Sequence, residues 1–148
     1  MTVAHRTDAL LAPSLTAAVV ALRTRGMRVS STRRALLERL FRAPRPLPAE
    51  QLAGGLDLAS VYRNLDALEA VGLVRHVHIG HGPGLYALAG PRDTGYVACE
   101  RCGRHSALDA GALAAVHAAV RCATGFEGDC SHFPIVGLCP DCALQAHG

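Results

Sequence analysis

Four of the six cysteines stand in two pairs at the spacing of metal ligands. Cys99 and Cys102 form the first Cys-x2-Cys pair, Cys139 and Cys142 form the second, and 36 residues separate the pairs. Zinc binds four thiolates as a tetrahedron, and two residues between ligands let one tight turn present both sulfurs. Because four protein ligands leave no open position for water, the pattern predicts a structural Zn²⁺ site rather than a catalytic one. The alternative is four buried free thiols.

The segment around these cysteines reads as a small α/β region. We expect a strand over 96–99, a turn at Gly103, a helix from Asp109 to Cys122 and a final strand over 133–138. The helix is expected to bury Leu113, Val116 and Val120. Such a short region buries little apolar surface on its own, so it is expected to need both a metal and a partner chain.

The first half of the chain has the pattern of a winged helix-turn-helix. Apolar spacing predicts a helix over 15–24, a second one capped by Ser30 and running to Phe41, and a short one over 48–52. Asp57 is expected to cap a further helix over 58–70, with a buried stripe of Val61, Leu65 and Leu68. After Gly72 the period changes to two, and a return strand over 85–88 completes a hairpin. Helices followed by a hairpin favour DNA binding, with 58–70 as the recognition helix.

Charge and side-chain chemistry point the same way. All 15 basic residues are arginine, and 11 of them lie before residue 91 against 6 acidic residues there. Arginine and tyrosine supply phosphate and base-edge contacts in the major groove. The alternative is a solvated helix face. The candidate DNA-binding residues, on and beside the predicted recognition helix, are Arg28, Arg33, Ser60, Tyr62, Arg63 and Asn64.

The chain resembles the ferric uptake regulator (Fur) family of metal-responsive repressors. The matching segments are Gly26–Arg33, Ala49–Leu52, Ser60–Leu65, Gly72–Val74 and the two cysteine pairs. The resemblance implies an α+β chain, with a winged helix-turn-helix followed by a small α/β dimerisation domain. The implied ranges are a flexible tail over 1–14, a DNA-binding domain over 15–89 and a zinc-containing dimerisation domain over 90–148. The implied partners are double-stranded operator DNA and a second copy of the chain.

Within that family, residues 73–82 are most similar to the nickel-responsive branch. This resemblance implies a regulatory metal held by His76, His78 and His132, with His81 as a further candidate. His76 and His78 are two residues apart on one predicted strand face, roughly 7 Å between Cα atoms, so both imidazoles can reach one ion. Imidazole suits nickel, copper and zinc alike, so the corepressor is expected to be Ni²⁺ or Zn²⁺. The alternative is two solvated histidines and an unrelated third.

A departure from the family concerns the stretch before the first cysteine pair. Family members carry a His-rich run there, whereas residues 91–96 contain no histidine. We therefore expect a second regulatory metal site to be missing or rebuilt.

Several classes of protein are not expected. No apolar run is long enough to span a membrane, and the first 13 residues lack the layout of a signal peptide, so we expect a cytoplasmic protein. No nucleophile–base pair stands out, so neither an enzyme nor a small organic substrate is expected. Two alternatives remain open: a family member that senses peroxide through Cys122, Cys130 or the cysteine pairs, and a zinc-stabilised interaction module without DNA binding.

Overall fold

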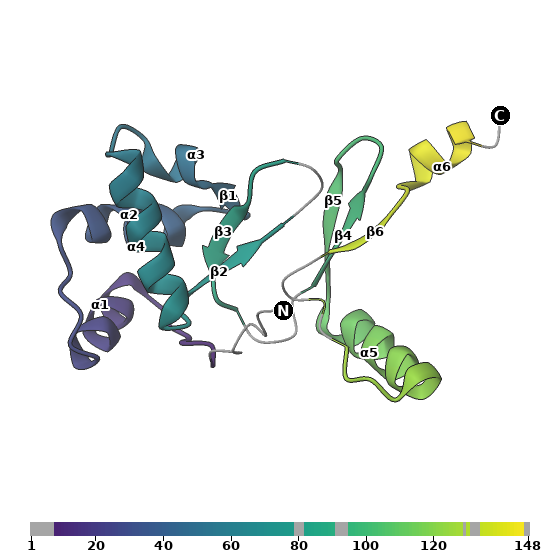
Figure 1. The fold of residues 1–148 in the computed structure, drawn as a ribbon, viewed down its shortest axis with the longest axis horizontal. Helices are drawn as coiled ribbons and strands as arrows, with labels where there is room; N and C mark the ends of the chain where they lie inside the picture. Colours follow the sequence, from purple (N-terminus) through teal and green to yellow (C-terminus); the bar gives the residue numbers. More distant parts are fainter. Residues whose placement is uncertain (1–7, 79–81, 91–94, 129, 131–133, 147–148) are drawn as a thin grey trace. The chain divides into compact units, whose positions relative to one another are not determined.

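The computed structural model describes residues 8–78, 82–90, 95–128, 130 and 134–146 (Figure 1). The chain forms two compact units. The N-terminal unit comprises Met1–His76 and Leu85–Gly90, and the C-terminal unit comprises Val77–Gly84 and Pro91–Gly148. No helix among the described residues is both long and apolar enough to cross a membrane.

Four helices and a three-stranded sheet build the N-terminal unit. The elements in chain order are α1 (Leu15–Thr24), α2 (Ser31–Arg42), β1 (Leu47–Pro48), α3 (Ala49–Ala53), α4 (Leu58–Ala70), β2 (Val74–Val77) and β3 (Leu85–Leu88). The sheet has the order β1-β3-β2, and β1 pairs antiparallel with β3 so that Leu47 lies opposite Tyr86. The predicted helices and return strand are confirmed, whereas the sequence did not predict β1.

Side-chain caps define where the helices of this unit begin. Ser30 Oγ accepts a hydrogen bond from the backbone N–H of Arg33 at 3.2 Å, and Asp57 accepts one from the N–H of Ser60 at 2.8 Å. Both contacts satisfy backbone donors that have no partner inside the helix. Both predicted caps are therefore confirmed, and the cap at Asp57 sets the first residue of α4.

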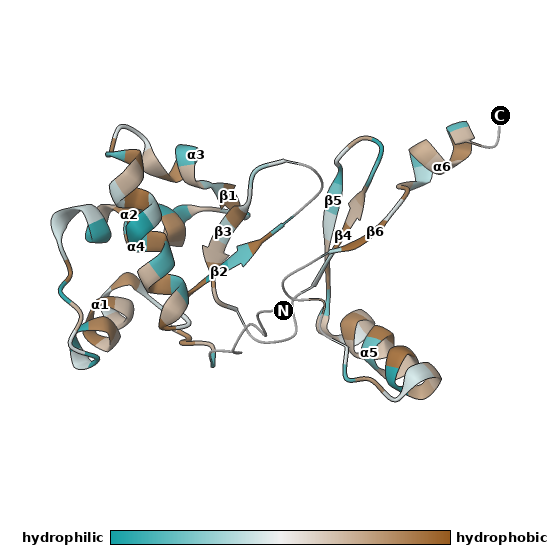
Figure 2. Ribbon diagram, viewed as in Figure 1, coloured by the Kyte–Doolittle hydropathy of each residue, from teal (hydrophilic) through white to brown (hydrophobic). Residues whose placement is uncertain are grey.

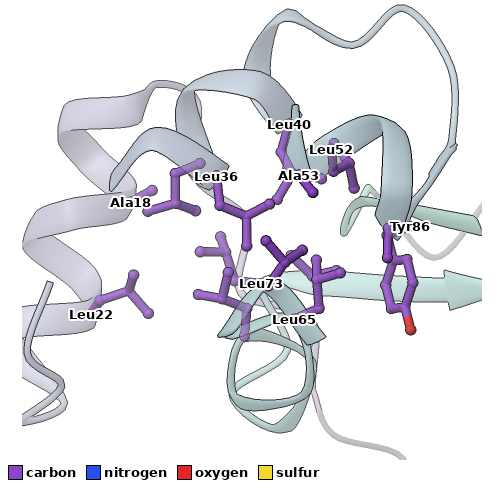
Figure 3. Packing of buried hydrophobic residues seen from close by; sticks show 14 of the residues in the cluster. Ala18, Leu22, Leu36, Leu40, Leu52, Ala53, Leu65, Leu73 and Tyr86 are labelled. Atoms are coloured by element: carbon purple, nitrogen blue, oxygen red, sulfur yellow. The ribbon is translucent and has the colours of Figure 1, made fainter. Parts of the chain in front are cut away.

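The helices of this unit surround one apolar core. Figure 2 shows apolar and polar residues sharing the surfaces of α1, α2 and α4, and Figure 3 shows the buried side chains meeting between these helices. The predicted stripe of α4 is confirmed, since Val61, Leu65 and Leu68 are fully buried. Leu73 and Tyr86 extend the core to the sheet. Burial of this stripe leaves Tyr62 and Arg63 exposed on the other side of α4.

The strand β2 departs from the predicted alternation. Val74 and Val77 are both buried, while Arg75 and His76 between them are half-buried. Strict period-two exposure is therefore wrong for this strand. The strand also ends at Val77, so His78 follows it instead of sharing a strand face with His76. The two valines are buried in different places, because Val74 belongs to the core cluster of the N-terminal unit, whereas Val77 is buried outside that cluster.

The C-terminal unit is a three-stranded sheet with two helices. Its elements are β4 (Gly95–Cys99), β5 (His105–Leu108), α5 (Ala110–Thr124), β6 (Ile135–Gly137) and α6 (Pro140–Ala146). The sheet order is β5-β4-β6, with β5 antiparallel and β6 parallel to β4. The sequence predicted neither β5 nor α6.

Only a small core forms in the C-terminal unit. Of the three side chains expected inside α5, Leu113 is buried, whereas Val116 and Val120 are only half-buried. The prediction for these two valines is wrong because a three-stranded sheet covers too little of the helix. Apolar side chains of β6 and the segment after it remain exposed, among them Ile135, Val136 and Leu138.

Candidate functional site

The sheet of the C-terminal unit brings the two cysteine pairs together. Cys99 ends β4, and the tight turn that follows is closed by the N–H of Gly103, which donates to the Cys99 carbonyl at 2.9 Å. The parallel pairing of β4 with β6 places Cys99 beside Gly137. Cys139 and Cys142 come directly after that point, where α6 begins. Strand pairing therefore closes the gap of 36 residues between the pairs.

The geometry of the four thiols fits a tetrahedral zinc ion. Their Sγ atoms all lie within 4.8 Å of one another, and those of Cys102 and Cys139 are 3.8 Å apart. Zn–S bonds of about 2.3 Å imply S···S edges of about 3.8 Å in a regular tetrahedron. Cys99 and Cys142 are buried, whereas Cys102 is exposed. These residues can hold one zinc ion at the end of the sheet where β4 ends and α6 begins.

The cluster also has the electrostatics of a cation site. Backbone N–H groups of Cys139 and Cys102 donate to the Cys99 sulfur and lower the pKa of that thiol to about 6. Hydrogen bonding to Cys139, followed by burial, raises the pKa of Cys142 to about 12. Four thiolates within 4.8 Å of one another repel, so a cation is needed to keep all four ionised. A zinc ion supplies that charge, because thiols that coordinate it are deprotonated.

Two arginines connect the turn after β4 with α6. Arg101 donates to the backbone carbonyl of Cys142 at 3.3 Å, and Arg104 forms a 2.7 Å ion pair with Asp141. The ion pair is largely exposed, so its contribution to stability is small. Both guanidinium groups nonetheless place positive charge next to a cluster that becomes anionic when four thiolates bind zinc.

The predicted DNA-binding residues form one connected surface of the N-terminal unit. Arg33 Nε donates to Asn64 Oδ1 at 2.8 Å, and Arg33 Nη1 donates to the carbonyl of Arg28 at 2.6 Å. Asn64 Nδ2 in turn donates to the carbonyl of Ser60 at 2.8 Å. Arg33 and Asn64 are half-buried and join α2 to α4. Their bonds place them as supports of the surface, below its exposed side chains.

Arg28, Tyr62 and Arg63 are the exposed members of that surface, and the last two lie on α4. Arg63 Nη2 donates to Ser60 Oγ at 2.9 Å, which holds the guanidinium near the N-terminus of α4. The Tyr62 hydroxyl donates to Glu50 Oε1 at 2.9 Å. The Tyr62 residue as a whole is 38% exposed. Tyr62 and Arg63 can therefore reach a nucleic acid lying against the first turns of α4.

The sequence did not predict the contacts that Glu50 and Arg39 make in this part of the fold. Arg39 of α2 donates to the carbonyls of Leu52, Ala53 and Gly54, which end α3. A guanidinium at a helix C-terminus satisfies carbonyls that have no helical partner. The sequence signal that was available is the short helix itself, since five residues closed by Gly54 leave most of its carbonyls unpaired.

The predicted regulatory histidines are placed only in part. His76 lies in β2, where its ring stacks on Tyr86 with centroids 4.5 Å apart and planes 6° from parallel. His78 is half-buried after the strand. His81 and His132 lie outside the described residues.

The comparisons with known proteins agree with this architecture. A helix-turn-helix domain family matches residues 29–77. No curated protein sequence matches the chain significantly.

Among solved structures, the Helicobacter pylori ferric uptake regulator Fur is similar with a TM-score of 0.66 and 18% identity, over 87% of this chain and 91% of that one. The Pseudomonas aeruginosa ferric uptake regulator with manganese has a TM-score of 0.64 and 26% identity, over 82% of this chain and 97% of that one. A zinc uptake regulator complexed with zinc and DNA has a TM-score of 0.54 and 20% identity, over 90% of this chain and 95% of that one. The predicted fold class, an N-terminal helix-turn-helix with a C-terminal α/β region, is therefore confirmed.

Proposed function

We propose that this chain is a dimeric, metal-dependent transcriptional repressor of the ferric uptake regulator type, and not an enzyme. The observation that carries the proposal is the pairing of two features in one chain. One is a helix-turn-helix unit that exposes Tyr62 and Arg63, and the other is a separate unit built around four cysteines. The similarity to a zinc uptake regulator bound to zinc and DNA supports the same combination.

The N-terminal unit is proposed to bind operator DNA through α4. Arg63 extends from an exposed position and Arg28 lies beside the start of α2, while Arg33 and Asn64 hold α4 against α2. Arginine side chains supply phosphate and guanine contacts, and an exposed tyrosine supplies base-edge contacts. Operator binding of the zinc-loaded chain, on a site selected from random duplex DNA, tests this role.

The variant Arg63→Ala is expected to weaken binding by about 5- to 150-fold while dimerisation and zinc content stay unchanged, because a bidentate base contact contributes about 1–3 kcal/mol. Arg121→Ala, in the C-terminal unit, is the matched control. Unchanged operator affinity of Arg63→Ala at physiological salt would move the DNA-binding surface elsewhere.

The C-terminal unit is proposed to hold a structural zinc ion in Cys99, Cys102, Cys139 and Cys142, and to form the dimer. The thiol geometry supports the metal. The small core and the exposed Ile135, Val136 and Leu138 support a second copy as the partner, because burial of these neighbouring apolar side chains in a dimer would enlarge the core of the unit. Sedimentation of the zinc-loaded chain measures the assembly directly.

The regulatory metal is proposed to be Ni²⁺ or Zn²⁺, with His76, His78 and His132 as ligands and His81 as an additional candidate. The resemblance implies ligands from two domains of the family fold. A metal that needs both binds more tightly in one arrangement of the chain, which couples metal binding to DNA binding. The support for this ligand set is the resemblance of residues 73–82 to the nickel-responsive branch and the affinity of imidazole for these metals.

The test of the regulatory site is operator binding during nickel and zinc titration. His132→Ala is expected to keep the structural zinc and the fold while losing metal-stimulated DNA binding. His105→Ala is the control, since His105 lies in β5 outside the proposed ligand set. A response of His132→Ala at wild-type metal concentrations removes His132 from the set.

A peroxide-responsive repressor is the second candidate, and exposed Cys122 is the observation in its favour.

Operator release by peroxide that is lost in Cys122→Ser would favour the oxidative signal. Absence of sequence-selective DNA binding under all conditions would leave an interaction module stabilised by zinc.

A further inference from the structure

Glu50 is an acidic residue at the edge of a surface proposed to meet a polyanion. It lies in the first turn of α3, and its Oε1 accepts the hydroxyl of Tyr62 at 2.9 Å. Both side chains are exposed. The hydrogen bond from the hydroxyl to Glu50 is the main cause of a raised pKa at Tyr62. The Glu50 carboxylate would repel DNA phosphates, so its contribution to DNA binding has to come from its contact with Tyr62.

The contact determines the direction in which the Tyr62 hydroxyl can bond further. A phenol has a single hydrogen, and once that hydrogen is donated to Glu50 the oxygen can only accept. In the major groove, adenine N6 and cytosine N4 carry donor amino groups, whereas thymine O4 and guanine O6 are acceptors. A tyrosine that only accepts therefore pairs with an amino-bearing base and is opposed by thymine O4 or guanine O6.

The neighbouring arginine does not compete for this carboxylate. Arg63 Nη2 bonds to Ser60 Oγ at 2.9 Å, on the side of α4 that Ser60 occupies. The hydroxyl of Tyr62 bonds instead to Glu50 of α3, so the two exposed side chains of α4 have different partners.

We propose that Glu50 is a specificity-determining residue: it fixes the Tyr62 hydroxyl as a hydrogen-bond acceptor that selects adenine or cytosine at one position of the operator. This inference rests on the proposed function, because it assumes that Tyr62 contacts base edges. It adds the chemical class of base that is read and assigns the choice to a residue of α3. Glu50 acts through Tyr62 and is a positioning residue in this sense.

The experiment is selection from a random duplex library by the zinc-loaded full-length chain and its variants. Tyr62→Phe removes the hydroxyl and is expected to relax one operator position at which the wild type prefers adenine or cytosine. Glu50→Ala is expected to relax the same position and admit thymine or guanine, by about three- to tenfold, the effect of one net hydrogen bond. Glu50→Gln is the matched control, because its amide oxygen still accepts from Tyr62 and preserves the preference.

A second readout does not depend on DNA. In the free protein, ring-labelled Tyr62 should titrate at lower pH in Glu50→Ala than in the wild type, since the bond to the carboxylate is gone. An unchanged titration overturns the proposed contact. Retention of the wild-type base preference by Glu50→Ala at the position that Tyr62→Phe relaxes overturns the proposed selection. Failure of the wild type to select any sequence instead overturns the proposed function.

Discussion

Replacing Cys99 by serine is expected to unfold the C-terminal unit while the N-terminal unit stays folded. Cys99 is buried at the end of β4, and its sulfur lies within 4.8 Å of those of Cys102, Cys139 and Cys142. A serine hydroxyl in its place is a poor zinc ligand at neutral pH, so the substitution removes one of four thiolates from the site.

The magnitude follows from comparing the metal with the core. Among the described residues of the C-terminal unit, the buried apolar side chains besides the cysteines are Val77, Tyr96, Ala98 and Leu113, and a fully buried valine or leucine contributes about 1.5–3 kcal/mol. Structural zinc sites contribute about 10–16 kcal/mol of apparent binding free energy in zinc-finger peptides. With so few buried side chains, the metal is the larger stabilising term in this unit. The N-terminal unit has a continuous core of its own and does not depend on the cysteines.

The assay combines zinc content by mass spectrometry, size by sedimentation and urea unfolding by circular dichroism. Cys99→Ser should lose zinc, sediment as a monomer and keep the helical signal of the N-terminal unit. Cys122→Ser is the control, because Cys122 is exposed on α5 and lies outside the cluster. A Cys99→Ser protein that holds about one zinc per chain and unfolds at the wild-type urea concentration would show that these thiols are not the structural site.

Four further predictions concern the N-terminal unit. Leu65→Ala should lower its free energy of unfolding by about 2–5 kcal/mol, because Leu65 is fully buried, whereas Leu58→Ala, at an exposed position, should change the urea midpoint little. Gly72→Ala should destabilise the protein and increase hydrogen exchange at the Leu10 amide, which donates to the Gly72 carbonyl, since φ is +80° and a Cβ would lie 2.2 Å from the Asp8 carbonyl oxygen. Gly26→Ala, with φ +76° and no atom within 4 Å of the new Cβ, should show only the backbone strain of about 1–2 kcal/mol. Hydrogen bonds from Ser60 hold the pKa of Asp57 below its ordinary value of 3.8. The Asp57 cap therefore stabilises α4 fully above pH 3.8, and this stabilisation is lost as the pH falls through the folded-state pKa. The Ser60 amide shift in a pH titration measures the loss, and Asp57→Asn should abolish the pH dependence.

Local sequence patterns were sufficient for the helices of the N-terminal unit. The ranges expected for α1 and α4 agree with the structure, because each has an apolar stripe at helical spacing and a residue suited to its boundary. Asp57 is an effective cap whatever surrounds it, since its carboxylate bonds to a backbone N–H only three residues away. Such signals depend on neighbours in the chain and are visible before the chain folds.

The strands and the last helix were less predictable. The strand β5 has four residues, and its identity depends on pairing with β4, where Val97 faces Ser106. The helix α6 has only seven residues, so its intrinsic stability is low. The burial pattern of β2 likewise depends on packing, since Val74 and Val77 are both buried. In each case contacts beyond the local sequence decide the structure.

The candidate site divides in the same way. Ligand type and the spacing within each cysteine pair are properties of the sequence, because one turn is enough to present two sulfurs. The meeting of the two pairs is a tertiary property, since only the parallel register of β6 on β4 places Cys99 beside Gly137. Glu50 and Tyr62 are twelve residues apart and lie on two different helices, so no periodicity within either helix specifies their contact. Packing of α3 against α4 decides that contact, and with it the direction of the Tyr62 hydrogen bond.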